Sequence, residues 1–361
     1  MQVIYDNIIF SIQKAGGISV YWIELIKRIA NQDKVIFYEL SNQNIFRNKL
    51  KLQTKKESGF SIKILRYLPF TKRAAKNSIF HSSYYRVSLQ KDVTNITTVH
   101  DFTYEHFRSG LAKYVHLWQK GFAIKRSDGI ICVSENTKKD LMKFYPNVKG
   151  SKIKVVYNGV GGEFVKLENP TNYLIDAFGV LKDKKYILYI GDRSSYKNFD
   201  VVIKVLKDLQ NCSLVVVGGQ EFSEKEKTTM KPLKNTICHF RCIDSHKLNI
   251  LYNNAFCLLY PSSYEGFGIP IVEAMKAGCP VVSTIKSSIP EIAGDAGLLV
   301  DEIEIDSFIK EIRKLEDTVF RKRIIDKGLE QSKKFSWDKC FDETYGFYKE
   351  TLENKNKFGN S

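Results

Sequence analysis

Short, continuously apolar segments recur along this chain, and each is followed by a stretch with helical periodicity. They are Val3–Phe10, Val35–Tyr38, Ile96–Val99 and Gly129–Val133 in the first half, and Tyr186–Ile190, Ser213–Val217, Cys257–Tyr260 and Pro280–Ser283 in the second. Strands that are apolar on both faces and alternate with amphipathic helices are typical of parallel sheets covered by helices on both sides. The pattern therefore predicts an α/β chain.

The length and the breaks in this pattern predict two domains. At 361 residues the chain is too long for one ordinary core. Turn-rich residues at 158–162 and 168–172 predict the linker, which gives domains at 1–165 and 166–335. The last segment, 336–361, carries aromatic residues at helical spacing and predicts a final helix with one apolar stripe.

Positive charge is concentrated in one part of the first domain. Lys and Arg number 56 against 40 Asp and Glu, a surplus of 16. Between Arg47 and Arg86 there are eleven basic residues and one acid, Glu57; the others are Lys49, Lys51, Lys55, Lys56, Lys63, Arg66, Lys72, Arg73 and Lys76. Such a surface attracts phosphates of nucleic acid, anionic lipid or a lipid-diphosphate acceptor. The plain alternative is a solvated face of a lysine-rich chain.

The sequence predicts a cytoplasmic protein. The N-terminal residues lack the charged-then-apolar build of a signal peptide, and no apolar run approaches the ~20 residues that span a bilayer. The seven cysteines are odd in number and scattered, which disfavours a disulfide framework. Peripheral contact with an anionic inner membrane is a further hypothesis from the charge.

The segment after Tyr260 carries the most detailed pattern in the chain. A buried strand ends there, a loop with Gly266 and Gly268 follows, Pro270 stands where a first helical residue belongs, and Gly278 stands where a helix ends. Such a loop presents backbone N–H groups, with a helix dipole behind them, to an anion above the strand ends.

Two carboxylates flank this loop. Glu265 precedes the helix and Glu273 lies in its first turn, so both can face one pocket and accept hydrogen bonds from hydroxyl groups. The plain alternative is that Glu273 complements the helix N-terminus and Glu265 is an exposed loop acid.

A second candidate site follows the strand Tyr186–Ile190. Gly191 is followed by Arg193 and Lys197, four residues apart on a strand-to-helix turn, so both cations can converge on one diphosphate. Ligands of open α/β sheets bind at such strand ends. Two solvated basic side chains are the plain alternative.

In the first half, Gly16 and Gly17 lie between a strand and a helix that starts near Val20, and His100 follows the strand Ile96–Val99. The glycines are a candidate ligand loop or a simple tight turn. His100 is a candidate site residue at the end of a strand, or a structural histidine.

These motifs together resemble retaining family-4 glycosyltransferases of GT-B fold (glycosyl transferases group 1), in a mannosyltransferase-like subset. The signature is Glu, seven residues, Glu within Pro-Ser-x-x-Glu-Gly-Phe-Gly-x-Pro, here Pro261 to Glu273. Further similar segments occur in the expected order and run through nearly the whole chain: Gly16–Ser19, Phe80–Ser82, Val99–Asp101, Val133–Thr137, Val156–Val160 and Ser288–Glu291.

The resemblance implies two Rossmann-like domains that face across a cleft, with the acceptor on the N-terminal side, the donor on the C-terminal side, and the final helix crossing back to the first domain. It implies catalytic roles for Glu265, His100, Arg193 and Lys197. The implied donor-binding residues are Gly16, Gly17, Gly191, Arg193, Lys197, Cys242, Ile243, Glu265, Gly266, Phe267, Gly268, Ile269 and Glu273.

It also implies the chemistry. A hexose, mannose or another, would leave a GDP- or UDP-linked donor with retention and without a metal, and would join a glycan or lipid-diphosphate-linked acceptor in bacterial capsule or O-antigen synthesis. Glu273 would hold the ribose, while Glu265 and His100 would orient the sugar. One departure is that Asp192 separates Arg193 from Gly191, where the commonest pattern has Gly followed by Arg.

Other readings are weaker. Cys238, His239, Cys242 and His246 lack the spacing of a zinc site, and no Asp-x-Asp pair follows an apolar strand. Neither Gly-x-Gly-x-x-Gly at the first strand nor a P-loop occurs, which disfavours dehydrogenases and ordinary NTPases. A sugar-nucleotide epimerase or hydrolase of related fold, and a non-catalytic binder of nucleic acid or anionic surfaces, remain as alternatives.

Overall fold

The computed structural model describes residues 1–30, 32, 34–57, 61–209 and 211–358. They form two compact units, Met1–Gly159 with the chain from Trp337 onward, and Val160–Ser336. The boundary between the first and second units therefore lies between Gly159 and Val160, whereas the turn-rich residues predicted it after residue 165. Residues 168–172, expected in the linker, belong to the second unit, where helix α7 begins at Pro170.

The first unit contains a seven-stranded parallel sheet in the order β3-β2-β1-β4-β5-β6-β7. The strands are β1 (Gln2–Asp6), β2 (Val35–Glu39), β3 (Lys55–Lys56), β4 (Ser78–Ser82), β5 (Val93–Val99), β6 (Gly129–Cys132) and β7 (Ile153–Val155). The predicted strand Val3–Phe10 was too long. It ends at Asp6, and helix α1 (Ile9–Ile12) begins at Ile9, whose N–H donates to Ser83 Oγ at 2.9 Å.

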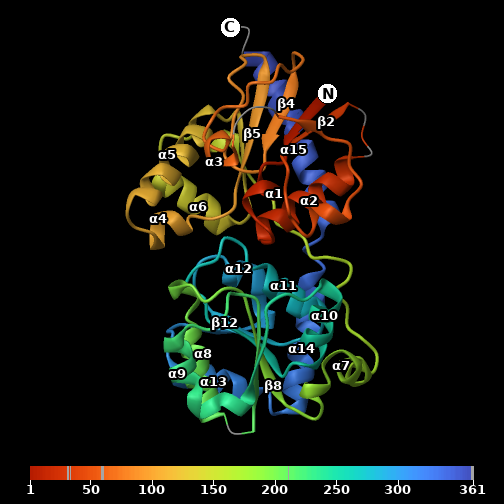
Figure 1. Ribbon diagram of the computed structural model, residues 1–361, viewed down its shortest axis with the longest axis vertical. Coiled ribbons are helices and arrows are strands. Elements are labelled where there is room, and N and C mark those ends of the chain that lie inside the picture. Colours follow the sequence, from red (N-terminus) through yellow and green to blue (C-terminus); the bar gives the residue numbers. More distant parts are fainter. Residues whose placement is uncertain (31, 33, 58–60, 210, 359–361) are drawn as a thin grey trace. The chain divides into compact units, whose positions relative to one another are not determined.

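Helices cover both faces of this sheet (Figure 1). Val3 and Tyr5 of β1 pack in one buried cluster with α2 (Gly17–Ile29) and α15 (Trp337–Phe358), while Ile4 packs on the opposite face with Phe80. The other helices of the unit are η1 (Arg47–Lys49), α3 (Ile62–Leu65), α4 (Thr103–Phe107), α5 (Leu111–Arg126), α6 (Glu135–Phe144) and η2 (Gly150–Lys152). This two-sided burial explains why the strands are continuously apolar.

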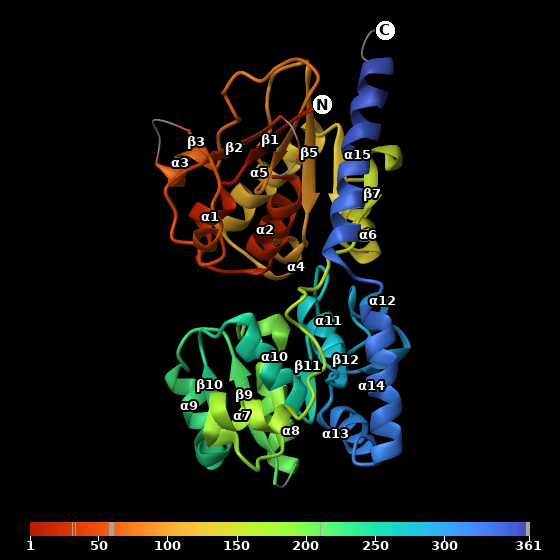
Figure 2. The ribbon, with the colours of Figure 1, turned by 90° about the vertical axis from the view of Figure 1, so that its right-hand side faces the viewer.

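Helix α15 comes from the end of the chain and lies along strands β4, β5 and β6 of this sheet (Figure 2). The hydroxyl of Tyr348 lies 3.0 Å from Tyr5 Oη and 2.5 Å from His81 Nδ1, and His81 Nε2 lies 2.9 Å from Thr98 Oγ1. Burial lowers the pKa of His81 to about 3, so the ring is neutral and can donate from one nitrogen and accept at the other. The network connects the last helix to three strands.

The second unit contains a six-stranded parallel sheet in the order β10-β9-β8-β11-β12-β13. The strands are β8 (Tyr186–Ile190), β9 (Ser213–Val217), β10 (Ile237–Phe240), β11 (Cys257–Tyr260), β12 (Val281–Thr284) and β13 (Gly297–Val300). The bounds predicted for β8, β9 and β11 are confirmed. The strand order reverses between β8 and β11.

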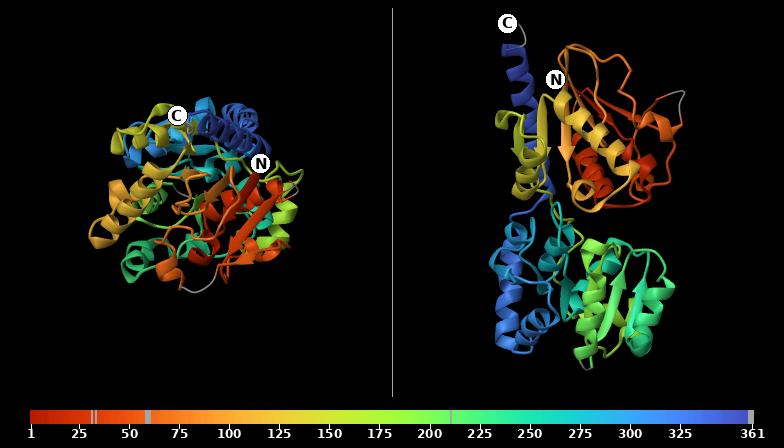
Figure 3. Two further views of the ribbon diagram at one scale, coloured as in Figure 1. Left: turned by 90° about the horizontal axis from the view of Figure 1, so that it is seen from above. Right: turned by 90° about the vertical axis from the view of Figure 1, so that its left-hand side faces the viewer.

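Helices lie on both sides of the second sheet as well (Figure 3, right). They are α7 (Pro170–Phe178), η3 (Gly179–Leu181), η4 (Ser195–Lys197), α8 (Phe199–Asp208), α9 (Glu224–Met230), η5 (Lys231–Thr236), α10 (Ser245–Asn254), α11 (Ile269–Lys276), α12 (Ile289–Ala293), η6 (Gly294–Ala296), α13 (Ile305–Lys314) and α14 (Thr318–Ser332). The predicted α/β architecture with two parallel sheets is confirmed.

Most basic residues of the segment from Arg47 to Arg86 are exposed, as its composition suggested, but Arg86 and Arg47 have acidic partners. Arg86 is buried and bonded to Glu57 at 2.8 Å and to Asp6 at 3.1 Å. Arg47 Nε donates to Glu39 at 2.7 Å. Arg86 is therefore a core residue, because two buried carboxylates neutralise it, and the prediction that it belongs to a surface was wrong.

The seven cysteines are all free thiols. Among the helices in the described part of the chain, none combines the length and the apolar character needed to cross a bilayer.

Gly129, the first residue of β6, offers a test of the packing of α15. A Cβ there would lie 2.8–2.9 Å from side chains of Ile96, Phe347 and Thr351. Gly129→Ala should therefore lower the free energy of unfolding by about 1–3 kcal/mol, since a packed interior resists added volume.

The matched control is Gly346→Ala on α15, where a Cβ would meet nothing within 4 Å. It should raise stability by up to about 1 kcal/mol, because alanine is the better helix former. Urea denaturation measures both. Equal effects of the two substitutions would refute the packing of α15 on β6.

Candidate functional site

Strands β8 and β11 are hydrogen-bonded neighbours at the point where the strand order reverses. The strands that follow β8 in sequence, β9 and β10, lie on one side of the pair, and those that follow β11, β12 and β13, lie on the other. In open α/β sheets the loops at such a reversal diverge and leave room for a ligand at the carboxyl ends of the strands. The loop after β8 contains Lys197, and the loop after β11 contains Glu265. Both predicted motifs of the second unit therefore lie at the position that the topology favours for binding.

Lys197 and Glu265 form an ion pair at this position. Lys197 Nζ lies 2.7 Å from Glu265 Oε1 and donates to Tyr260 Oη at 3.2 Å. Their side chains are only 11% and 13% exposed. Burial alone would lower the pKa of Lys197, but Glu265 and the phenols of Tyr260 and Tyr196 outweigh it and raise the pKa well above the ordinary value. The ammonium group is therefore positively charged at neutral pH.

The loops that carry this pair are fixed by further hydrogen bonds. Asn198 donates to the carbonyl of Pro261 and to Ser263 Oγ, both at 2.8 Å, and the N–H of Ser263 donates to the carbonyl of Tyr196 at 2.7 Å. These bonds join the loop after β8 to the loop after β11.

The loop after β12 supports Glu265 from the other side. The N–H of Glu265 donates to Ser287 Oγ at 2.7 Å, and Ser288 Oγ donates to the carbonyls of Glu265 and Phe267 at 2.9 and 3.0 Å. No role could be predicted from the sequence for Ser287, Ser263 or Asn198. Their only signal was that small polar residues follow buried strands, which is also typical of ordinary turns.

The helix start predicted after this loop is confirmed. Helix α11 begins at Ile269, with Gly268 as its N-cap at φ +97° and Pro270 in its first turn, and Gly278 just beyond its end has φ +75°. Glycine is needed at both positions because other residues rarely adopt positive φ. The N-terminus of α11 thus follows directly from the loop that carries Glu265.

Glu273, the second carboxylate of the motif, lies in α11 but beyond its first turn, so the predicted place in the first turn was wrong because the helix already begins at Ile269. Its Oε2 accepts a hydrogen bond from Tyr252 Oη at 2.9 Å. Burial, with a smaller contribution from the charge of Glu163, raises the pKa of Glu273 to about 7, and the bond from Tyr252 opposes the rise. The group can therefore gain or lose a proton close to neutral pH.

Arg193 has partners other than Lys197. Its Nε donates to Glu226 Oε1 of α9 at 2.6 Å, and its Nη2 donates to the carbonyls of Gln220 and Glu221 at 2.7 and 3.1 Å. The guanidinium lies over the ring of Phe222, 4.6 Å from its centroid. These contacts connect the loops after β8 and β9 to α9, so the convergence of Arg193 and Lys197 on one diphosphate stays a prediction.

The remaining predicted residues of the second unit also follow strands. Gly191 follows β8 with φ +127°, and a Cβ there would lie 3.5 Å from the side chain of Lys197. Cys242 and Ile243 follow β10, where Cys242 is exposed and Ile243 half-buried. Gly266, Phe267, Gly268 and Ile269 form the start of α11 and the loop before it.

Gly16, Gly17 and His100 belong to the first unit. Gly16 is the N-cap of α2, which starts at Gly17 and not near Val20 as predicted. His100 follows β5, with its ring edge-on to Tyr21 at 4.9 Å between centroids. Burial, opposed by Asp101 and supported by Lys120, lowers the pKa of His100 to about 4, so the ring is neutral. A neutral imidazole can donate and accept hydrogen bonds.

Within the described residues, no three His, Cys, Asp or Glu side chains gather where they could hold a metal ion. His239, one of the four residues whose spacing argued against a zinc site, has its Nε2 2.8 Å from the carbonyl oxygen of Gly218.

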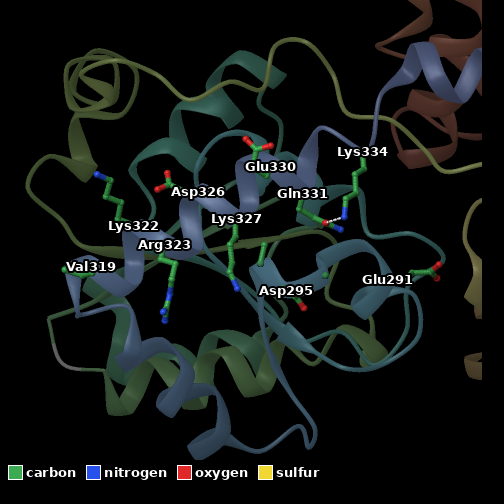
Figure 4. Close-up of a pocket in the computed structure, with 12 residues that line it drawn as sticks. Glu291, Asp295, Val319, Lys322, Arg323, Asp326, Lys327, Glu330, Gln331 and Lys334 are labelled. Atoms are coloured by element: carbon green, nitrogen blue, oxygen red, sulfur yellow. Dashed lines mark hydrogen bonds between the residues drawn. The ribbon is translucent and has the colours of Figure 1, made fainter.

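A groove of about 920 Å³ lies elsewhere on the second unit, between α14 and the residues around η6 (Figure 4). Its lining carries both signs of charge, with Lys322, Arg323 and Lys327 near Asp326 and Glu330, and it includes none of the predicted site residues.

Two family models match the chain in succession. Residues 15–162 match the model "Glycosyltransferase Family 4", and residues 174–331 match "Glycosyl transferases group 1". The two matches correspond to the first and second units and include the loops described above.

The chain is also similar to individual proteins. It is 33% identical over 173 residues to O-antigen chain mannosyltransferase B of Escherichia coli, covering 45% of each chain. It is 30% identical over 234 residues to O-antigen chain mannosyltransferase RfbU of Salmonella typhimurium, covering 62% of each. The chain thus aligns with about half to three fifths of the length of these relatives.

Among solved structures, it resembles the Anabaena protein Alr3699/HepE in complex with UDP and glucose. The TM-score is 0.74 at 16% identity, over 96% of this chain and 98% of that one. The likeness shows the GT-B fold that the sequence predicted.

The raised pKa of Glu273 predicts a pH-dependent stability. An acid whose pKa is higher in the folded state contributes stability at low pH that is lost as pH rises from its ordinary value of 4.5 through about 7. Glu273→Gln removes this titration. The stability of the wild type relative to Glu273→Gln should therefore fall by about 1–3 kcal/mol between about pH 5 and about pH 8. Urea unfolding of both proteins at the two pH values measures this difference in stability, and a difference that does not change with pH would contradict the prediction.

The contacts of Arg193 predict a loss of stability. Arg193→Ala should lower the free energy of unfolding by about 1–3 kcal/mol, because Glu226 and two carbonyls lose their donor. The matched control is Arg241→Ala, since Arg241 pairs with Glu221 in an exposed position. That change should cost at most about 1 kcal/mol. Equal losses in the two variants would argue against the described arrangement of Arg193.

Proposed function

Since the chain belongs to the glycosyltransferases described by the Family 4 and group 1 models, we propose that it transfers a hexose from a nucleotide-diphosphate sugar to a glycan or lipid-linked acceptor, with retention at the anomeric carbon. The observation that carries this proposal is the buried pair of Lys197 and Glu265 at the strand reversal. It places a permanent cation and a hydrogen-bond acceptor together where a phosphorylated ligand would bind.

Lys197 would act on the leaving group. When the bond between the sugar and the phosphate breaks, negative charge accumulates on the departing diphosphate, and a preorganised cation lowers the barrier. The raised pKa of Lys197 keeps that cation charged without a ligand. The N-terminus of α11 adds the positive end of a helix dipole after the same loop.

Glu265 would act on the sugar. A carboxylate accepts hydrogen bonds from sugar hydroxyls, and the bonds from Ser287 and Ser288 to its backbone hold it in place. On donor binding, Lys197 would exchange Glu265 for the diphosphate, while Glu265 would exchange Lys197 for hydroxyl groups. Each charge would thus keep a partner, which avoids the cost of an unpaired buried charge.

Glu273 would bind the ribose in its ionised form, and neutral His100 would orient the sugar from the first unit. Domain closure would exclude water, because hydrolysis competes with transfer. Cys242 and Ile243 would lie near the base. Gly16 and Gly17 would approach the donor phosphates or shape the acceptor site.

The names of the relatives support mannose as the hexose and an O-antigen-like polysaccharide as the product. The UDP complex of the Anabaena protein supports a nucleotide-diphosphate sugar as the class of donor. We propose GDP- or UDP-linked donors, transfer without a metal, and a cytoplasmic site of action at the inner membrane, where a lipid-diphosphate acceptor would be found.

A donor panel tests the proposal. GDP-mannose, UDP-glucose, UDP-galactose, UDP-N-acetylglucosamine and dTDP-rhamnose would each be incubated with the protein, and release of the nucleoside diphosphate followed with and without a chelator. Release from one donor in the presence of chelator is expected. No release together with no binding of any nucleoside diphosphate would overturn the proposal.

The roles of the buried pair predict the effect of substitution. Lys197→Met and Glu265→Gln should each lower turnover of the accepted donor by roughly 10²–10³, the scale of removing one preorganised charge-stabilising group. The matched control is Lys204→Met on α8, whose lysine is 52% exposed. Thermal melting would establish that each variant is folded. Turnover like that of the wild type in both site variants would refute the assignment.

A further inference from the structure

The first sheet has a strand reversal of the same kind as the second. Strands β1 and β4 are hydrogen-bonded parallel neighbours, with β2 and β3 on one side of the pair and β5, β6 and β7 on the other. Loops at the carboxyl ends of such a pair diverge and leave room for a ligand. The loops after β1 and β4 are therefore a second place in the chain where the topology favours binding.

The loop after β4 is held in a conformation that its residues rarely adopt. Tyr85 has φ +48°, in the left-handed region that is uncommon for a bulky residue. Ser83 Oγ donates to the carbonyl of Asp6 at 2.7 Å, and Arg86 lies 3.1 Å from the carboxylate of Asp6. These contacts join the loops after β1 and β4. Strained backbone that is fixed in this way is concentrated at functional sites.

Tyr84, in the same loop, belongs to a group of half-buried rings. Its hydroxyl lies 3.3 Å from Nδ1 of His116 on α5, and His116 stacks on Tyr104 of α4 with 3.9 Å between ring centroids. Burial, supported by Lys120, lowers the pKa of His116 to about 4, so that ring is neutral. Aromatic surface without negative charge therefore lies beside the carboxyl end of β4.

Arg66, at the end of α3, lies against these rings. Its guanidinium carbon is 5.0 Å from the ring centroid of Tyr84 and 5.0 Å from that of Tyr67, which is within the range of cation–π contacts. The carbonyl of Arg66 accepts a hydrogen bond from Gln119 of α5. The contacts join α3, α4 and α5, which lie on the same side of the first unit (Figure 1).

Arg66 lacks the acidic partners that the neighbouring Arg86 has. Arg86 is paired with Asp6 and Glu57, whereas Arg66 forms no ion pair among the described residues. Its Nε is buried and has no hydrogen-bond partner in that part of the chain. Rings that pack against the faces of a guanidinium leave the N–H groups at its edge available, and these N–H groups match phosphate oxygens in pairs. Arg66 is thus a positioned cation whose anion is missing.

We propose that Arg66, together with the rings of Tyr67 and Tyr84, binds the diphosphate that links the acceptor sugar to its lipid. We call these three residues the Arg66 site. The guanidinium would donate to the phosphate oxygens, and the rings would pack against the apolar face of the adjoining sugar. The inference rests on the proposed function, and it goes beyond that proposal because it selects a diphosphate-linked acceptor over a free glycan and assigns its binding residues.

The local charge favours a diphosphate over the single carboxylate of an acidic sugar. Residues 61–76 include five basic side chains and no acid. A surface of one sign attracts the more highly charged ligand more strongly. The tyrosine rings add a contact that a free phosphate ion cannot use, so the expected ligand carries both an anion and an apolar surface.

Two matched probes test the Arg66 site without turnover. Both carry N-acetylglucosamine on the same alkyl chain, one through a diphosphate and the other through a direct glycosidic bond. Calorimetry should show that the wild type binds the diphosphate probe roughly tenfold or more tightly, the scale of hydrogen bonds to a charged group. Arg66→Met should remove this preference. Arg66→Lys should keep part of it, because it retains the charge and loses the paired N–H groups.

Lys63→Met is the matched control, since Lys63 is an exposed cation on the same helix. It should keep the preference for the diphosphate probe. Tyr84→Phe should keep it too, because the ring remains, and thermal melting would establish that each variant is folded. Equal binding of the two probes by the wild type would overturn the proposal, as would no binding of the diphosphate probe or a preference that survives Arg66→Met.

Further measurements distinguish the sources of the anion. A preference that is lost in Lys197→Met and kept in Arg66→Met would mean that the diphosphate of the probe occupies the candidate donor site, and the proposal would be wrong. An alkyl glucuronide that binds as tightly as the diphosphate probe would show selection of a carboxylate instead. Arg66→Met that weakens binding to phosphatidylglycerol vesicles but not to the diphosphate probe would assign Arg66 to lipid headgroups. Either of these two results would also overturn the proposal.

The inference and the proposed function can fail separately. Nucleoside diphosphate binding tests Lys197 and Glu265, and Arg66→Met should leave that binding unchanged. If no nucleotide binds but the preference for the diphosphate probe holds and depends on Arg66, the Arg66 site stands without the transfer reaction. If nucleotides bind and Arg66→Met keeps the preference, the inference about Arg66 is wrong and the proposed function is unaffected.

Discussion

The candidate site depends on the ion pair between Lys197 and Glu265. Each of these side chains alone would be a nearly buried charge, and an unpaired buried charge costs several kcal/mol. As a pair they can be buried together, with Lys197 Nζ 2.7 Å from Glu265 Oε1, although they come from the loops of two neighbouring strands. The hydrogen bonds of Asn198 and Ser288 then hold the loops in that relation. A ligand that offers both an anion and hydroxyl groups can replace the pair without leaving either charge alone, and a sugar diphosphate has that composition.

Much of this was predictable from the sequence, for a physical reason. Buried parallel strands are apolar on both faces, so β8, β9 and β11 could be delimited to the residue. Gly268 and Pro270 mark a helix start that requires their particular backbone geometry. Partners that are distant in sequence were not predictable. Arg193 contacts Glu226, and Arg86 contacts Asp6 and Glu57, and neither pairing follows from local composition. A count of charged residues suggests that such side chains are exposed, although each of them is paired with a carboxylate.

Helix α5 shows the same limit of prediction from sequence for apolar residues. Periodicity places Leu111, Tyr114 and Trp118 on one face, but it does not say whether that face is inside. Helix α5 buries its other face, which carries Ala123 and Ile124 as well as Lys120, and the ion pair of Lys120 with Glu105 allows that charge to be buried.

The connection of α15 to the first unit has a consequence for how the protein is made. The second unit, Val160–Ser336, is one continuous stretch of chain, so it can fold as soon as those residues leave the ribosome. The first unit cannot complete its core at that stage. Tyr348 bonds to Tyr5, 343 residues earlier, and Trp337, Cys340 and Phe341 belong to the same core as Val3 and Tyr5. Strand β1 is therefore made long before α15, and the face of the sheet that α15 covers stays open until residues 337–358 have been made.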